Sequence, residues 1–310
     1  MARVGIVRLA TRGSPLALRQ TELVADLLQL AHPGLEVETV VVRTRGDRDA
    51  ETPLDRIGGQ GVFVTEVEAA VADGRAHAAV HSAKDLPSVM PGHLALAAVP
   101  PRADVRDGLV GCTLTGLPAG GLIATGSARR RAQLAYLRPD LVFTSLRGNM
   151  ARRVATGEEG SVAAVVVAVA AMDRLGWRDR LTDVLDPVDL LPQAGQGAIA
   201  VQCRADDEAT RSLLVPVDHE PSHRAVRTER AVLAALGGSC TAPFGAWAEA
   251  VDGGGVHVTG MVASGDGRLL VRLAAEGDDP EGTGAALARA LLDGGGAAIE
   301  AFAADAAGGP

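Results

Sequence analysis

Strand-forming and helix-forming segments alternate through the first third of the chain. Apolar runs at residues 4–10, 37–42 and 76–80 are typical of buried strands, and two segments with helical periodicity separate them. This β-α-β-α-β order predicts a parallel sheet with helices on its faces. We therefore expect an α/β fold.

The first predicted helix has clear start and stop signals. Ser14 followed by Pro15 matches the residue types preferred at the N-cap and at the first helical position. The sequence His32-Pro33-Gly34 predicts its end. A loop at residues 58–61 leads into the second predicted helix, at about residues 62–72.

A second α/β unit is expected after Pro100-Pro101. Strands are predicted at residues 122–125, 141–145 and 162–170, and Ser127 is predicted to cap a helix that extends to Pro139. The first and second units begin alike, because residues 9–14 and 123–127 each lead from a strand to a serine-capped helix with arginine close by. Two similar lobes that face each other across a cleft would explain this likeness.

The last third predicts a small α+β domain. A strand at 198–202 precedes a helix capped by Ser222 that extends to about Leu236, and strands are expected at 245–250, 256–262 and 269–273 before a helix at 283–292. The Ala- and Gly-rich residues 303–310 are expected to form a disordered tail. The expected domains are residues 1–101 with 197–217, residues 102–196, and residues 218–310.

Composition excludes several classes of protein. Apolar residues make up 47% of the chain but aromatic residues only 2%, so the cores must consist of aliphatic side chains. A net charge of −8 argues against binding to nucleic acid or anionic membranes. No apolar stretch or signal sequence suits a membrane or secreted protein, so we expect a soluble, cytoplasmic one. The three cysteines, Cys112, Cys203 and Cys240, fit neither a disulfide framework nor a zinc site.

An arginine cluster predicts an anion site in the second unit. Seven arginines oppose the single acid Asp140 between residues 127 and 153. Two of them, Arg129 and Arg130, are expected in the first turn of a helix, where the free N–H groups also favour anions. We expect a ligand carboxylate or phosphate here, although a solvated basic face would give the same pattern.

The segment His81-Ser82-Ala83-Lys84-Asp85 follows the third predicted strand, at the sheet edge where α/β folds bind ligands. Lys84 is the only lysine among 30 cationic residues, which suggests a need for a compact ammonium, or a chance survival. It could be a Schiff-base nucleophile or a carboxylate anchor. Asp85 could stabilise a cation, and a salt bridge or helix cap is the structural alternative. We expect structural roles for His81 and Ser82.

Cys240 lies in a loop of small residues, between Gly238-Ser239 and Thr241-Ala242-Pro243, whereas Cys112 and Cys203 lie beside or within apolar segments. An accessible cysteine in a loop is a candidate reactive thiol.

Taken together, these segments resemble the hydroxymethylbilane synthase family, the porphobilinogen deaminases. The resemblance covers residues 8–249. It rests on the segments 10–18, 58–66, 81–87, 127–130, 145–149 and 195–198 and on the Cys240 loop.

The resemblance implies two lobes like periplasmic binding proteins, with mainly parallel sheets, and a third domain that carries the cysteine. It implies a transferase of porphyrin and heme biosynthesis that condenses four porphobilinogen molecules into hydroxymethylbilane and releases ammonia. It also implies a dipyrromethane cofactor, attached to Cys240 by a thioether, which primes the growing chain. No metal is implied, and we expect a monomer that binds neither nucleic acid nor membrane.

The resemblance also implies roles for individual residues. Asp85 is expected to be catalytic, because its carboxylate can stabilise the cations formed on pyrrole nitrogens. The expected cofactor-binding residues are Cys240, Lys84, Asp85, Ser127, Arg129 and Arg130. The expected substrate-binding residues are Arg12, Ser14, Arg147, Arg153 and Arg174.

The sequence departs from the family pattern at two places. Arg56 and Gln60 stand where the family often has lysines around the glycine loop, which puts their contact with ligand in doubt. Ser239 lies between Gly238 and Cys240, where Gly-Gly-Cys is common, and a serine should fit this loop. Two alternative functions stay open at this point: a non-catalytic two-lobed protein that binds small anions, and a Lys84 Schiff-base enzyme.

Overall fold

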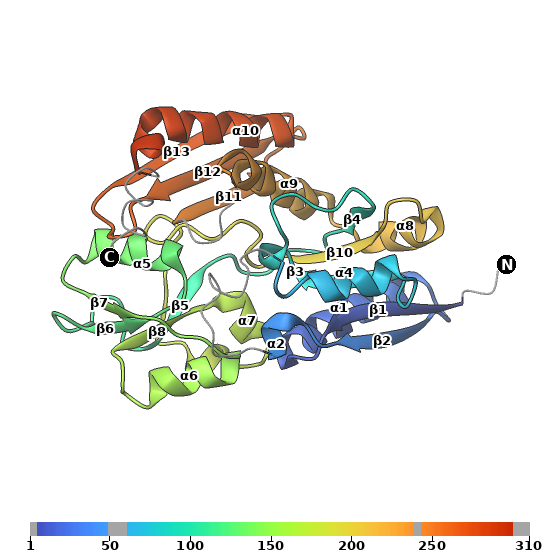
Figure 1. Cartoon of the computed structure of the whole chain (residues 1–310), viewed down its shortest axis with the longest axis horizontal. Coiled ribbons are helices and arrows are strands. Elements are labelled where there is room, and N and C mark those ends of the chain that lie inside the picture. The colour runs from blue at the N-terminus through green and yellow to red at the C-terminus, as the bar shows by residue number, and fades with distance from the viewer. Residues whose placement is uncertain (1–4, 49–60, 238–242, 300–310) are drawn as a thin grey trace. The chain divides into compact units, whose positions relative to one another are not determined.

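The computed structural model describes residues 5–48, 61–237 and 243–299 (Figure 1). The chain divides into two units by its internal contacts. Unit 1 contains Met1–Ala103 and Ala198–His223, and unit 2 contains Asp104–Gly197 and Arg224–Pro310. One sheet belongs to unit 1 and two sheets belong to unit 2. The predicted α/β class is confirmed, whereas a separate domain at residues 218–310 stays a prediction.

Unit 1 contains a five-stranded sheet in the order β2-β1-β3-β10-β4. β1 pairs in parallel with β2 and β3, while β10 pairs antiparallel with β3 and β4. The parallel order is therefore confirmed for the first three strands, and the sheet as a whole is mixed. The strands are β1 (Ile6–Arg12), β2 (Glu36–Val42), β3 (Ala78–Ser82), β4 (Leu94–Ala98) and β10 (Ile199–Arg204). The helices are α1 (Pro15–Ala31), α2 (Arg45–Arg48), α4 (Thr65–Ala72) and α8 (Glu208–Leu214), with short 3₁₀ turns η1 (Ala83–Asp85) and η3 (Val215–Val217).

Helices cover both faces of this sheet because side chains alternate along its strands. Leu9 packs in one core with Leu28 of α1, while its neighbour Ala10 packs in another core with Val67 of α4. Ser14 caps α1 as predicted, since its side chain accepts a hydrogen bond from the backbone N–H of Ala17.

Unit 2 contains a second five-stranded sheet, in the order β7-β6-β8-β5-β9. β6 is parallel to β7 and β8, and β5 is antiparallel to β8 and β9. The strands are β5 (Asp107–Gly111), β6 (Leu122–Ala124), β7 (Val142–Thr144), β8 (Ala164–Ala168) and β9 (Asp183–Val184). The helices are α5 (Ala128–Leu137), α6 (Met150–Glu158) and α7 (Val169–Arg174), with the 3₁₀ turn η2 (Arg178–Arg180).

The third sheet is antiparallel, in the order β11-β12-β13. Its elements are β11 (Phe244–Ala250), β12 (Val256–Ala263), β13 (Leu270–Gly277), α10 (Pro280–Leu291) and the π turn η4 (Leu292–Gly296). Helix α9 (Glu220–Ala235) also packs in its core. Helix α5 packs on both sheets of unit 2, because Leu134 joins the core of the five-stranded sheet and Ala132 contacts the core that contains Met261 of β12.

Several predicted boundaries differ from the observed ones. Strands β1 and β3 lie two residues later than predicted, α4 begins three residues later, α10 begins three residues earlier and β13 ends four residues later. The apolar run at 162–170 is divided between β8 and α7, since a continuous apolar run is compatible with both kinds of element.

The predicted start of α9 is also wrong, and Ser222 is not its N-cap. The hydroxyl of Ser222 instead accepts a hydrogen bond from the backbone N–H of Arg102 (3.0 Å) and lies 2.8 Å from Nδ1 of His219. Pro221 has no N–H to satisfy, so it fits the first turn and the helix begins before Ser222.

Within the residues that the structure describes, no helix is both long and apolar enough to span a bilayer.

Candidate functional site

The 3₁₀ turn η1 carries Lys84 and Asp85 at the carboxyl end of β3. The backbone N–H of Ala83 donates to the carbonyl oxygen of Ala198, 3.0 Å away, and the N–H of Leu86 donates to the carbonyl oxygen of Ala83. These bonds fix the turn beside the start of β10. Lys84 is half-buried and Asp85 is exposed, so the carboxylate of Asp85 is accessible at this sheet edge.

Arg12 and Ser14 lie at the same edge, because β1 is parallel to β3. The guanidinium of Arg12 is ion-paired with Asp47 and lies over the ring of Phe63, 4.1 Å from its centroid. Burial raises the pKa of Asp47, but the hydrogen bond and charge of Arg12, with bonds from Thr44, outweigh it and lower this pKa. The orientation of Arg12 is therefore set by two side chains that the sequence did not point to.

His81 is buried directly beneath this edge. Burial and the positive charge of Arg12 lower the pKa of the imidazole to about 4, with Gln202 acting weakly in the opposite direction. Its Nε2 atom has no well-aligned hydrogen-bond partner among the described residues. Beside it, Ser82 accepts a 2.9 Å hydrogen bond from Nε2 of Gln20 on α1. These surroundings suit the structural roles expected for His81 and Ser82.

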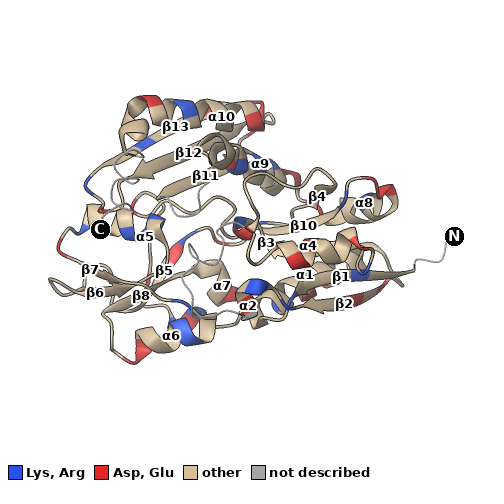
Figure 2. Cartoon of the chain, viewed as in Figure 1, with Lys and Arg blue, Asp and Glu red and all other residues tan. Residues whose placement is uncertain are grey.

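In unit 2 the parallel strands β6, β7 and β8 end at one edge, so the segments that follow them gather there. The first turn of α5 follows β6, the loop with Arg147 follows β7, and α7 follows β8. Figure 2 shows basic residues on both α5 and α6. Ser127 caps α5 as predicted, since its hydroxyl accepts from the N–H of Arg130.

Arg129 and Arg130 are buried, with exposed fractions of 4% and 5%, and both pair with Asp107. Nη2 of Arg129 lies 2.6 Å from Oδ2 of Asp107, and Nη2 of Arg130 lies 2.6 Å from Oδ1. Each guanidinium also donates to a backbone carbonyl, that of Leu191 for Arg129 and that of Val166 for Arg130. The counter-charge of Arg129 and Arg130 is Asp107, which lies outside the segment 127–153 in which the sequence shows Asp140 as the single acid.

This cluster keeps one excess positive charge, since two guanidiniums face one carboxylate. Burial raises the pKa of Asp107, but the charges and hydrogen bonds of both arginines hold it well below its usual range. Nε of Arg129 is buried without a hydrogen-bond partner among the described residues. A buried donor of this kind is costly, and a carboxylate ligand would satisfy it. The site therefore fits a group that carries carboxylates.

The remaining predicted arginines lie at or near the same edge. Asn149 caps α6, and within that helix Nε of Arg153 donates to the carbonyl oxygen of Gly148, 3.0 Å away. Arg147, just before this turn, is half-buried. Arg174 ends α7, where Nη2 donates to the carbonyl oxygen of Gly197 at 2.6 Å, and burial lowers its pKa to about 10.

Four predicted features lie outside the described residues: Cys240, with the rest of its loop at 238–242, Arg56, Gln60, and the tail at 303–310. The described chain ends at Gly237, just after α9, and resumes at Pro243, just before β11. Of the other cysteines, Cys203 is buried in the core of unit 1, where burial raises the pKa of its thiol to about 11. Cys112 is half-buried.

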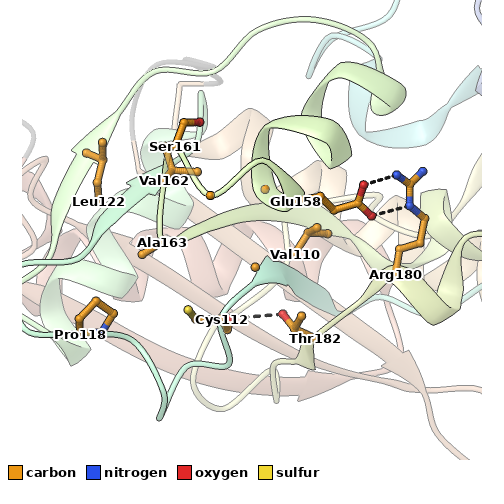
Figure 3. Close-up of a pocket in the computed structure, with 13 residues that line it drawn as sticks. Val110, Cys112, Pro118, Leu122, Glu158, Ser161, Val162, Ala163, Arg180 and Thr182 are labelled. Carbon is orange, nitrogen blue, oxygen red and sulfur yellow. Dashed lines mark hydrogen bonds and ion pairs between the residues drawn. The ribbon is translucent and has the colours of Figure 1, made fainter.

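A pocket of about 660 Å³ lies elsewhere in unit 2 (Figure 3). Its lining includes Leu122 at the start of β6 and Ala163 just before β8. The pocket therefore lies at the edge of the sheet opposite to Arg129 and Arg130. Its charged pair is already satisfied, because Arg180 donates to both oxygens of Glu158. None of the predicted site residues lines this pocket.

Nothing in the sequence indicated Asp47 and Asp107, which orient the predicted arginines. Phe63 and Gln196 lie in the segments 58–66 and 195–198 that carry the resemblance but had no predicted role, yet Nε2 of Gln196 donates to Oδ1 of Asp107 at 2.9 Å. An aspartate in a short helix or at the start of a strand carries no local signal of such a partner, so these contacts require the tertiary structure.

Comparisons with known proteins show the family to which the chain belongs. A family model described as porphobilinogen deaminase, dipyrromethane cofactor binding domain, matches residues 7–212, and the porphobilinogen deaminase C-terminal domain model matches residues 223–293. A porphobilinogen deaminase of Roseiflexus sp. (strain RS-1) is 46% identical over 295 residues, covering 94% of this chain and 97% of that protein. One from Syntrophobacter fumaroxidans (strain DSM 10017 / MPOB) is 43% identical, covering 88% and 89%.

Solved structures resemble the chain loosely. The methionine-binding protein MetQ superposes with a TM-score of 0.41 and 10% identity, covering 68% of this chain and 89% of that chain.

Proposed function

Because the chain belongs to the porphobilinogen deaminase family, we propose that it condenses four porphobilinogen molecules head to tail into hydroxymethylbilane, with release of ammonia. The observation that carries the site assignment is the exposed carboxylate of Asp85, fixed by η1 at the sheet edge that also holds Arg12. Family membership decides in favour of an enzyme over a non-catalytic anion-binding protein.

The cofactor of this family is a dipyrromethane, which supplies the pyrrole terminus from which the product chain extends. We propose a thioether to Cys240 and contacts from Lys84, Ser127, Arg129 and Arg130 as its attachment. Two observations support this part of the proposal: the buried Nε of Arg129 has no hydrogen-bond partner among the described residues, and two guanidiniums face the single carboxylate of Asp107.

Each porphobilinogen carries an acetate and a propionate, so binding requires several cations. Arg12, Arg147, Arg153 and Arg174 would bind these carboxylates, with Ser14 as a hydrogen-bonding partner. The guanidinium of Arg12 is already held in one orientation by its ion pair with Asp47 and its contact with the ring of Phe63. Less conformational entropy is therefore lost when it binds a carboxylate.

Asp85 would provide the electrostatic part of the reaction. Loss of ammonia from porphobilinogen leaves a cation, and attack by the next pyrrole creates a second one. A fixed carboxylate close to the pyrrole nitrogen stabilises each positive charge as it forms, without reorganising solvent. Asp85 is exposed at the end of β3, and its carboxylate forms no ion pair with another of the described residues. Its negative charge is therefore available to a ligand, which supports this role.

Intact-mass spectrometry of the purified, active protein tests the proposal. We expect a mass above that of the polypeptide by an adduct of two pyrrole units. The Cys240→Ser variant should have the bare mass and no turnover, while the matched variant Cys112→Ser should keep the adduct. A bare mass in protein that still makes hydroxymethylbilane would refute the assignment.

A Lys84 Schiff base predicts a different result. Borohydride with substrate would then trap an adduct on Lys84, and Lys84→Arg would abolish turnover. Under our proposal Lys84 is a carboxylate anchor, so Lys84→Arg should keep substantial turnover and borohydride should trap nothing.

We further propose that the protein acts in the cytoplasm as a monomer and binds neither nucleic acid nor membrane. Its net charge of −8 and scarcity of aromatic residues support the absence of nucleic-acid binding. Light scattering after size exclusion should give the mass of one chain, and a dimer mass would contradict this part.

A further inference from the structure

Asp107 is the first residue of β5 and is completely buried. β5 runs antiparallel to β8, in the register Asp107↔Ala168, so Asp107 lies at the end of β8 where α7 begins. The sheet thus delivers one carboxylate from a neighbouring antiparallel strand to the edge where the arginines gather. With no exposed surface, this carboxylate is shielded from ligand.

Four hydrogen bonds from three side chains hold the two oxygens of Asp107. Oδ1 accepts from Nε and Nη2 of Arg130, at 3.1 and 2.6 Å, and from Nε2 of Gln196, at 2.9 Å. Oδ2 accepts from Nη2 of Arg129 at 2.6 Å. Because the oxygens have different arginine partners, the position of one carboxylate sets the orientation of both guanidiniums.

Gln196 anchors this carboxylate in turn. It also donates to the carbonyl oxygen of Val105, 2.7 Å away, and it lies between Gly195 and Gly197, whose φ angles are 76° and 83°. Glycine adopts this left-handed conformation without strain, so the Gly-Gln-Gly loop can direct the amide of Gln196 at Asp107. The N–H of Gly195 is itself bound at 2.6 Å by the buried carboxylate of Glu229.

We propose that Asp107 is a positioning residue: it holds Arg129 and Arg130 in the orientation that receives the carboxylates of the cofactor and of the porphobilinogen unit that adds to it, and Gln196 keeps Asp107 in place. This inference rests on the proposed function. It assigns Asp107 no contact with cofactor or substrate. Its effect is on binding through the arginines, whereas the charge stabilisation at Asp85 is untouched.

The test compares Asp107→Asn with Asp104→Asn in the full chain, purified in the same way. Asp104 also pairs with arginines, Arg106 and Arg178, but it contacts neither Arg129 nor Arg130. In Asp107→Asn we expect the adduct-bearing fraction, read by intact mass, to fall about tenfold or more, since charged hydrogen bonds to both arginines are lost. In the fraction that remains loaded, KM for porphobilinogen should rise while kcat stays nearly unchanged. Asp104→Asn should keep normal loading and KM.

Normal loading and normal KM in folded Asp107→Asn would overturn the inference. A lower melting temperature with normal KM in the loaded fraction would also overturn it, because that is the outcome of a purely structural role. If wild-type protein carries no adduct, the proposed function fails and this inference fails with it. If the wild type is loaded and Asp107→Asn matches it in loading and KM, only this inference fails, so the two failures are distinguishable.

Gln196→Met provides a second variant that does not depend on the folding of Asp107→Asn. It keeps both ion pairs and removes only the amide that fixes Asp107. We expect KM to rise about threefold or more with kcat maintained, as for the loss of one hydrogen bond in the interior. Unchanged KM in this variant would show that Asp107 needs no positioning partner and would contradict the proposal.

Discussion

Asp85 and Asp107 are carboxylates in opposite surroundings. Asp107 is fully buried between two guanidiniums, so its charge is committed to holding them. Asp85 is exposed at the end of a strand, where its charge is available to a ligand. The same side chain thus orients the binding groups at one position and is proposed to serve the reaction at the other.

Replacing Asp85 by asparagine should separate catalysis from cofactor attachment. We expect Asp85→Asn to fold and keep the adduct but to lose roughly 10²-fold or more in kcat, as happens when one preorganised electrostatic group is removed. Steady-state kinetics with porphobilinogen measures this loss. Asp73→Asn, at an exposed acid paired with Arg75, should behave as wild type. Near-normal turnover in Asp85→Asn would remove Asp85 from its assigned role.

His81 should make the stability of the protein depend on pH. Its pKa is lowered to about 4 from the ordinary 6.5, so between these values the unfolded chain binds a proton that the folded chain does not. The free energy of unfolding should therefore fall as the pH drops from 6.5 to 4, by up to about 3 kcal/mol. Urea unfolding at several pH values measures the slope, and His81→Leu should reduce it. An equal slope in both proteins would contradict the buried, neutral state of His81.

At the scale of elements, helix N-termini place most of the predicted binding residues. Ser14, Ser127 and Asn149 cap α1, α5 and α6, each after a parallel strand that ends at the ligand edge. A capped first turn is rigid, so the arginines within or beside it have defined positions. The sequence predicted the caps at Ser14 and Ser127, because a cap is a local feature, but it gave no prediction for Asn149 and a wrong one for Ser222.

Removing the cap of α6 should weaken both the helix and the orientation of Arg153. The side chain of Asn149 accepts a 3.0 Å hydrogen bond from the N–H of Arg152, so Asn149→Ala should lower the free energy of unfolding by about 1 kcal/mol. Asn149→Asp, which can still cap, should keep the stability. Chemical denaturation measures both, and equal losses in the two variants would show that the cap is not the cause.

Glu229 on α9 connects a loop and a strand, because its carboxylate accepts hydrogen bonds from their backbone N–H groups. Its carboxylate on α9 accepts from the N–H of Gly195, and from the N–H of Ala248 on β11 at 2.8 Å. In Glu229→Gln, one of the two accepting oxygens is replaced by an NH₂ group, which cannot accept a hydrogen bond from the N–H of Gly195 or Ala248. We therefore expect the free energy of unfolding to fall by about 1–3 kcal/mol. Glu249→Gln, at an exposed position on β11, should leave it unchanged. If the two variants are equally stable, the buried bonds contribute nothing.

At the scale of the molecule, the two five-stranded sheets have the same plan. In the orders β2-β1-β3-β10-β4 and β7-β6-β8-β5-β9, three parallel strands are followed by one strand of opposite direction, β10 or β5, and then by one that runs with the first three, β4 or β9. Ser14 follows β1 and Ser127 follows β6, the middle strand of the parallel three in each sheet. This equivalence explains the likeness of residues 9–14 and 123–127, and it supports the prediction of two similar lobes.

The sequence alone determined the α/β class, the helix caps at Ser14 and Ser127, the family resemblance and the arginine-rich segments, because periodicity, capping and motifs are local along the chain. The tertiary structure decided that β10 pairs antiparallel with β3 in one sheet and that β5 pairs antiparallel with β8 in the other. Strand neighbours depend on crossovers that local patterns do not encode. It also decided the counter-charge of Arg129 and Arg130, which Asp107 supplies from 22 and 23 residues away. A buried ion pair is formed by packing, and packing brings together residues whose distance along the chain is arbitrary.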